Sequence, residues 1–144
     1  MKRLWQMLLV VALGALGLAA GVSLAWAQQR ADAQAREVMK AKLEHTQAVL
    51  EAIAIEDFAK AQTNAQKLSR LAQASGWQSR QTPEYELFTL EFRRRADALA
   101  QAASEKNVDG ATMAYVQLTI SCVNCHKHLR GRKTAALSTA HILL

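Results

Sequence analysis

The scarcity of helix-breaking residues constrains the fold of this chain more than any other feature. Between Val22 and Arg130 the sequence contains one proline, Pro83, and two glycines, Gly76 and Gly110. Alanine, leucine, glutamine, lysine and glutamate, which all favour helices, dominate the rest of this stretch. No segment alternates apolar and polar residues with the period of two that a half-buried strand requires. We therefore expect an all-α chain.

Apolar side chains three and four residues apart divide this stretch into four amphipathic segments. We expect helices over residues 31–55, 56–75, 83–105 and 110–130. The longest connection covers residues 76–82, where Thr82 before Pro83 predicts an N-cap, and Asp109 is the expected cap of the last helix. Short links between helices of about twenty residues favour an antiparallel up-down-up-down four-helix bundle.

The N-terminus has the organisation of an export signal. Lys2 and Arg3 precede an apolar segment that ends at Ala27 in an Ala-x-Ala pattern. This arrangement is typical of a signal peptide cleaved after Ala27, while the length of the apolar segment also suits a retained membrane anchor. Both alternatives place residues 28–144 outside the cytoplasm, so we expect a periplasmic protein that contacts the membrane only if the anchor is retained.

The exported part is long enough for one domain with one core. We expect residues 1–27 to be the signal peptide or anchor, residues 28–133 the bundle and residues 134–144 a frayed tail. The formal net charge is +6, and Lys127 and Arg130 belong to a basic cluster in the last expected helix. Such a cluster suits a solvated helix end or an acidic partner, whereas export argues against nucleic acid.

The two cysteines of the chain, Cys122 and Cys125, are three residues apart and directly precede His126. The helical spacing places all three on the apolar face of the fourth expected helix. A disulfide of this spacing fits poorly inside a regular helix, and a redox dithiol needs a helix N-terminus to lower its thiol pKa. A zinc site needs further ligands; the remaining histidines are His45, His128 and His141.

The pattern Cys-x-x-Cys-His is the attachment motif of c-type haem. Two thiols one helical turn apart can form thioethers with the two vinyl groups of one porphyrin, and the next histidine can bind the iron. Export fits this interpretation because c-type haem is attached outside the cytoplasm. We therefore expect one haem c per chain, with Cys122 and Cys125 as attachment residues and His126 as an iron ligand.

A four-helix bundle with this motif near the end of its last helix resembles the class II cytochromes c, the cytochrome c′ family. The resemblance covers roughly residues 31–131, and Leu129 stands where the family usually has an aromatic residue. The residues that match the family's C-terminal motif are Cys122, Cys125, His126 and Arg130. The resemblance implies that Arg130 belongs to the haem site.

The resemblance also implies how the other side of the iron is arranged. Low-spin members supply a methionine from an R-x-x-x-M-K-like stretch, which Met39-Lys40 matches, with Arg36 one residue closer than usual. Met39 is then the expected distal ligand and Arg36 a haem propionate contact, with His45 as a rival ligand. High-spin members leave the distal position empty and can bind nitric oxide or carbon monoxide.

These features favour a one-electron carrier that docks a redox partner protein, which the basic cluster predicts to be acidic. A high-spin protein that binds nitric oxide or carbon monoxide is the first alternative, and an interaction domain whose motif is never loaded is the second. We expect no enzymatic activity, because the sequence offers no carboxylate pair, nucleophile with its base, or phosphate loop. The resemblance also implies a homodimer.

Overall fold

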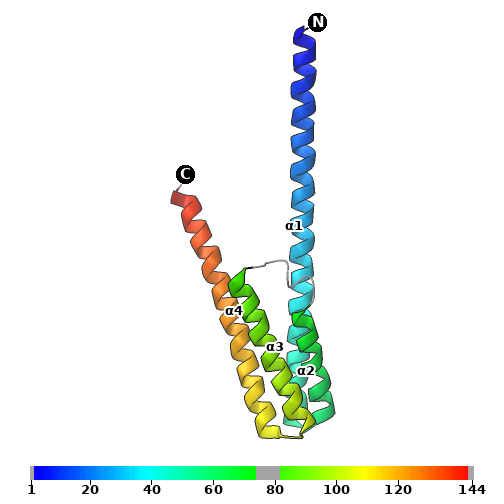
Figure 1. Cartoon of the computed structure of the whole chain (residues 1–144), viewed down its shortest axis with the longest axis vertical. Coiled ribbons are helices and arrows are strands. Elements are labelled where there is room, and N and C mark those ends of the chain that lie inside the picture. Colours follow the sequence, from blue (N-terminus) through cyan, green and yellow to red (C-terminus); the bar gives the residue numbers. More distant parts are fainter. Residues whose placement is uncertain (1, 74–81, 143–144) are drawn as a thin grey trace. The chain divides into compact units, whose positions relative to one another are not determined.

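The structure, a computed structural model, describes residues 2–73 and 82–142. Within these two ranges every regular element is helical, which confirms the all-α prediction (Figure 1). The helices are α1 (Lys2–Ala54), α2 (Phe58–Ala72), α3 (Pro83–Ser104) and α4 (Val108–Ile142). The chain forms two compact units, Met1–Glu37 and Val38–Leu144. The second unit holds α2, α3, α4 and the C-terminal part of α1.

The N-terminal unit is helical from Lys2 onward, so the expected start of the first helix at residue 31 is wrong. A single glycine in a helix costs about 1 kcal/mol relative to alanine, and the glycines of this segment do not end the helix. The side chains of residues 4–24 are not described; in the rest of the described chain, no helix contains a stretch long and apolar enough to cross a membrane. Cleavage after Ala27 and retention as an anchor both stay predictions.

The second unit is the expected antiparallel up-down-up-down four-helix bundle (Figure 1). Each helix contributes one large side chain that is fully buried. These residues are Val49 from α1, Leu68 from α2, Leu99 from α3 and Leu118 from α4. They belong to one core cluster, in which alanines fill much of the space between the helices.

The buried face of α1 agrees in part with the three-four apolar spacing. That spacing predicts one face that holds Met39, Leu43 and Leu50 and is widened by Val38, Val49 and Ala52. Val38, Val49 and Ala52 are buried, whereas Leu43 is 59% exposed and Leu50 is 51% exposed. Lys42 is buried as well, and periodicity alone misses it because lysine is seldom buried.

The α1–α2 and α3–α4 connections have the same backbone geometry. Glu56 follows α1 with φ 55°, and Lys106 follows α3 with φ 55°. In both turns the next residue donates its backbone N–H to a carbonyl five residues back, at 2.9 Å for Asp57 and 3.0 Å for Asn107. Both connections are therefore Schellman turns, in which a left-handed residue ends the helix.

The residue that ends each turn also caps the next helix. Asp57 Oδ1 accepts a 2.9 Å hydrogen bond from the N–H of Lys60, and Asn107 Oδ1 accepts one of 2.8 Å from the N–H of Gly110. Asn107, not Asp109, therefore caps α4, because the turn ends two residues earlier than expected. Both side chains satisfy a backbone donor that the helix itself leaves unpaired.

The two turns lie at the same end of the bundle (Figure 1). Close to them, Ala52, Ala61 and Ala103 form a small cluster and are at most 1% exposed. We call the two turns and these three alanines the closed end. Alanine side chains are short, so they allow three helices to approach closely here.

Of the remaining expected helix boundaries, the start of α3 is confirmed and the end of α4 is wrong. Thr82 caps α3 as expected, since its Oγ1 accepts a 3.3 Å hydrogen bond from the N–H of Tyr85. Most of the expected 76–82 loop lies outside the described residues. The expected end of the fourth helix near Arg130 is wrong, because α4 continues through Gly131 to Ile142. The residues after Gly131 include good helix formers such as alanine and leucine, so one glycine does not stop the helix.

Candidate functional site

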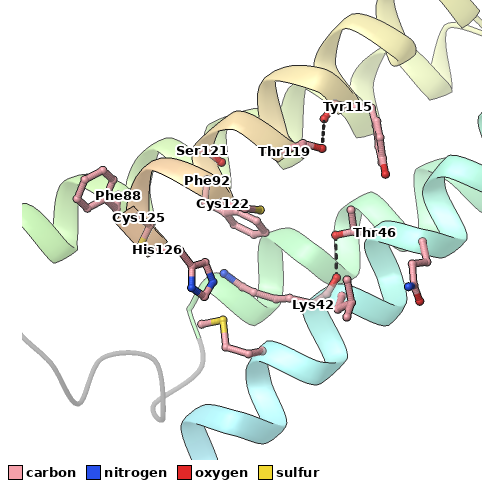
Figure 2. Close-up of a pocket in the computed structure, with 13 residues that line it drawn as sticks. Lys42, Thr46, Phe88, Phe92, Tyr115, Thr119, Ser121, Cys122, Cys125 and His126 are labelled. Carbon is pink, nitrogen blue, oxygen red and sulfur yellow. Dashed lines mark hydrogen bonds between the residues drawn. The ribbon is translucent and has the colours of Figure 1, made fainter. Parts of the chain in front are cut away.

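The second unit contains a cavity of about 440 Å³ between α1, α3 and α4 (Figure 2). Well-packed interiors contain few voids larger than a water molecule, so a cavity of this size suits a ligand. From α1 it is lined by Met39, Lys42, Leu43, Thr46 and Gln47. From α3 and α4 it is lined by Phe88, Phe92, Tyr115, Thr119, Ser121, Cys122, Cys125 and His126.

Both cysteines lie on the cavity wall, well inside α4, as the sequence predicts. Cys125 is 6% exposed, Cys122 is half-buried, and both are free thiols. His126 also lines the cavity, but its side chain is exposed. It therefore lies at an open edge of the cavity, whereas the two thiols face its interior. α4 thus brings a thiol pair and an imidazole to one cavity within about one helical turn.

Burial raises the pKa of both thiols above its ordinary value, and the nearby positive charge of Lys42 opposes this shift only in part. The thiols are therefore protonated at neutral pH. A redox dithiol requires the opposite, a lowered pKa that supplies thiolate. The position of the pair inside the helix and the raised pKa together argue against thioredoxin-like chemistry.

Lys42 is the charged residue of the cavity wall, and its side chain is buried with 6% exposure. Its Nζ lies 3.5 Å from the centroid of the Phe92 ring, a cation–π contact. Burial lowers the pKa of Lys42 from its ordinary 10.5 to about 8, against the attraction of Cys122 and Cys125. The ammonium form is therefore still the main one at neutral pH, but it is held in an environment that disfavours charge.

The threonine and serine hydroxyl groups of the wall form hydrogen bonds with carbonyls of their own helices (Figure 2). Thr46 Oγ1 donates to the carbonyl of Lys42 at 2.7 Å, and Thr119 Oγ1 donates to the carbonyl of Tyr115 at 3.0 Å. Ser121 Oγ donates to the carbonyl of Leu118 at 2.7 Å. These local bonds satisfy the hydroxyl donors. The cavity therefore presents mainly apolar surface to a ligand.

The two expected candidates for the distal ligand differ in position. Met39 lines the cavity, and it also packs against the small cluster of Val38 and Tyr85. His45 faces α2 instead, where its Nδ1 donates a 2.9 Å hydrogen bond to Asn64 Oδ1. The structure therefore brings Met39, and not His45, to the cavity that holds the thiols.

The other expected site residues are placed as follows. Arg130 is exposed on α4, four residues after His126. Arg36 is exposed on α1 and belongs to the N-terminal unit, so its role as a propionate contact stays a prediction. His128 is half-buried, and its ring packs against Phe88 with 5.3 Å between the centroids. His128 thus supports the cavity wall from behind.

Sequence reasoning missed Lys42, Phe88 and Phe92 as members of the site. The signal for Lys42 is its place between Val38 and Val49, four residues after the first and seven before the second, on the face that the structure buries. The two phenylalanines lie on the apolar face of α3, and nothing in their spacing separates a cavity wall from a filled core.

The described part of the chain holds no group of three or more histidine, cysteine, aspartate or glutamate side chains placed to bind a metal ion. The residues present fit a covalently attached haem in other respects. Two free thiols share one wall, a histidine adjoins them, and the opposite helix supplies a thioether in Met39. No model of a known protein family matches the chain, and no curated protein matches it.

Proposed function

We propose that the chain is an exported c-type cytochrome that carries one haem c and transfers single electrons. The observation that carries this proposal is the α4 wall of the cavity, where Cys122, Cys125 and His126 lie within about one helical turn. Their spacing suits the two vinyl groups and the iron of one porphyrin. The mainly apolar cavity supports the same choice, because cofactor sites are commonly apolar with a few polar groups.

Each residue of the site has one role in this proposal. Cys122 and Cys125 would hold the group through thioether bonds, and His126 would bind its iron. Met39 on α1 is the proposed second ligand, and a thioether ligand raises the reduction potential. The bound haem supplies a reversible one-electron change between ferric and ferrous iron. Phe88 and Phe92 exclude water from the cavity, which favours a small reorganisation of solvent during electron transfer.

The surface around the motif suits an acidic redox partner. Lys127 and Arg130 are exposed on α4, next to the residue proposed to bind iron. Positive charges at this edge would steer a partner with an acidic surface towards the site that exchanges electrons. The class II resemblance adds Arg36 and Arg130 as haem contacts and a homodimer to the proposal, and the N-terminal export signal adds a periplasmic location.

A second candidate is a high-spin protein that binds nitric oxide or carbon monoxide. The observation that favours it is the contact of Met39 with the Val38 and Tyr85 cluster. Packing against that cluster can hold the thioether away from the iron. The distal position would then be open to a small ligand.

One experiment tests the proposal and separates it from this alternative. The full chain is produced in cells with a working haem attachment system, and covalent haem is detected after denaturing electrophoresis. Absorption spectra are then recorded for the oxidised form, the reduced form and the reduced form with carbon monoxide. Val123→Ser is the matched control for Cys122→Ser and Cys125→Ser, because Val123 lies on the same helical turn and is 45% exposed.

We expect covalent haem in the wild type and in Val123→Ser, and reduced attachment in each cysteine variant. A low-spin spectrum that carbon monoxide does not change would support the electron carrier with a filled distal site. A high-spin spectrum that shifts with carbon monoxide would favour the second candidate. Wild-type protein without covalent haem would contradict both and leave an interaction domain as the better interpretation.

A further inference from the structure

Lys42 is the feature of the cavity that the proposed function does not yet use. Its side chain runs from α1 towards His126 on α4 and lies against Phe92 of α3 (Figure 2). It is 6% exposed, so the cavity and not the surface surrounds it. It lines the same cavity as Cys122 and Cys125, the two proposed attachment residues. The positive charge therefore lies beside the attachment residues.

A lysine at this position is costly for stability. An ammonium group loses its hydration on burial, and contact with an aromatic face offsets only part of that loss. Methionine or leucine would fill a similar volume on this wall without the cost. Buried ionisable groups that disfavour their own charged form, located in a cavity, are typical of functional sites. A role that needs the charge itself would account for this cost.

A fixed positive charge acts directly on a redox centre in the same cavity. Gain of one electron makes the centre more negative by one charge, so a nearby ammonium stabilises the reduced state more than the oxidised state. The effect is stronger where water is excluded, and dissolved salt screens it much less than it screens a surface charge. Lys42 meets both conditions, whereas Lys40 on the same helix is exposed.

We propose that Lys42 sets the reduction potential of this site, by holding an ammonium group on the cavity wall that raises the potential of a haem attached to Cys122 and Cys125. The inference rests on the proposed function. Lys42 acts through its positive charge and is not an iron ligand. Met39 keeps the ligand role proposed above.

The test compares full-length, haem-loaded wild type with Lys42→Gln, Lys42→Arg and Lys40→Gln. Lys40→Gln is the matched control, because it removes the same charge from an exposed position of α1. Haem content and the oxidised and reduced absorption spectra are recorded first, to establish that attachment and iron coordination are unchanged. The reduction potential is then measured by spectroelectrochemical titration at low and at high salt.

We expect Lys42→Gln to lower the equilibrium constant for reduction about tenfold, which corresponds to about 59 mV for a one-electron couple. Lys42→Arg should keep most of the wild-type potential. Lys40→Gln should cause a smaller decrease that disappears at high salt, whereas the decrease in Lys42→Gln should persist.

Two outcomes would overturn the inference while haem attachment remains intact. One is a Lys42→Gln potential that does not differ from that of Lys40→Gln. The other is a loss of low-spin character in Lys42→Gln with no such loss in Met39→Leu, which would make Lys42 an iron ligand. Wild-type protein without covalent haem would instead overturn the proposed function, and this inference with it.

Discussion

The closed end and the cavity of the bundle share α1 and α3, yet they are packed in opposite ways. At the closed end, Ala52, Ala61 and Ala103 are at most 1% exposed and leave the helices close together. Around the cavity, the walls carry larger side chains such as Phe88 and Phe92, and a space of about 440 Å³ remains. Small residues therefore close the bundle where nothing is to be bound, and large ones hold it open where a ligand fits.

This difference predicts where a truncated side chain will cost most. Leu68 is fully buried in the main core, and Leu68→Ala should lower the free energy of unfolding by about 3 kcal/mol, because it removes apolar contacts and leaves a void. Leu43→Ala, at an exposed rim of the cavity, should cost far less. Urea denaturation of the unloaded chain measures both. Equal losses at the two positions would contradict the comparison.

The next largest effect concerns the buried charge of the cavity wall. Lys42→Met removes the cost of holding an ammonium there, so the variant should be more stable than wild type at pH 7. The pKa of Lys42 falls from 10.5 to about 8 on folding, which limits the gain to about 3 kcal/mol at 1.36 kcal/mol per pKa unit.

The sign of its pH dependence follows from the same shift. Below about pH 8 the lysine is protonated in the folded and the unfolded chain, so wild type carries the full cost. Between about pH 8 and pH 10.5 the unfolded chain binds more protons, so wild-type stability rises relative to the variant. Urea denaturation at a series of pH values should show the gap between the two proteins closing. A gap that stays constant would contradict the lowered pKa.

Removal of a helix cap should have a smaller effect on stability, and caps are present at the closed end and at the start of α3. Asn107→Ala removes a 2.8 Å cap at the closed end and should cost about 1 kcal/mol. Thr82→Ala removes a cap of 3.3 Å at the start of α3 and should cost less, since the longer hydrogen bond is weaker. Thermal unfolding of both variants beside wild type measures the difference. A larger loss of stability for Thr82→Ala would contradict the prediction that the shorter hydrogen bond makes the stronger cap.

The smallest expected effects lie in the two turns. Glu56 and Lys106 both hold a left-handed backbone, which costs a residue with a side chain about 1–2 kcal/mol. Glycine removes this cost but loses more freedom on folding, so Glu56→Gly and Lys106→Gly should each stabilise the bundle by only about 0.5 kcal/mol. Denaturant midpoints that move in opposite directions for the two variants would contradict the shared geometry.

Much of the fold could be predicted from the sequence, because helix formers and a three-four apolar spacing leave few alternatives. The Thr82 cap and the four-helix topology followed from local chemistry that tertiary packing did not change. Two other features could not be predicted in this way. Lys42 was missed on the buried face of α1 because it is buried against the usual preference of lysine, and the end of α4 was misplaced because helix formers follow Gly131.

The candidate site divides along similar lines. The thiol pair and His126 could be predicted to share one face because they are three and four residues apart on one helix, and the structure brings them to one cavity. The residue that faces the thiols from α1 could not be predicted, because it depends on which residues of α1, α3 and α4 meet across the bundle. Met39 lines the cavity and His45 does not face it, a distinction that a single helix pattern does not contain.

The matched turns of the closed end have a consequence for the order in which the protein assembles. Each turn joins helices that are neighbours in the chain, so its contacts form between residues close in sequence, and such contacts form quickly. The α1–α2 and α3–α4 hairpins can therefore pair through Val49, Leu68, Leu99 and Leu118 before anything occupies the cavity. Under the proposed function, the chain would then be ordered at one end while the thiols at the other remain accessible for haem attachment.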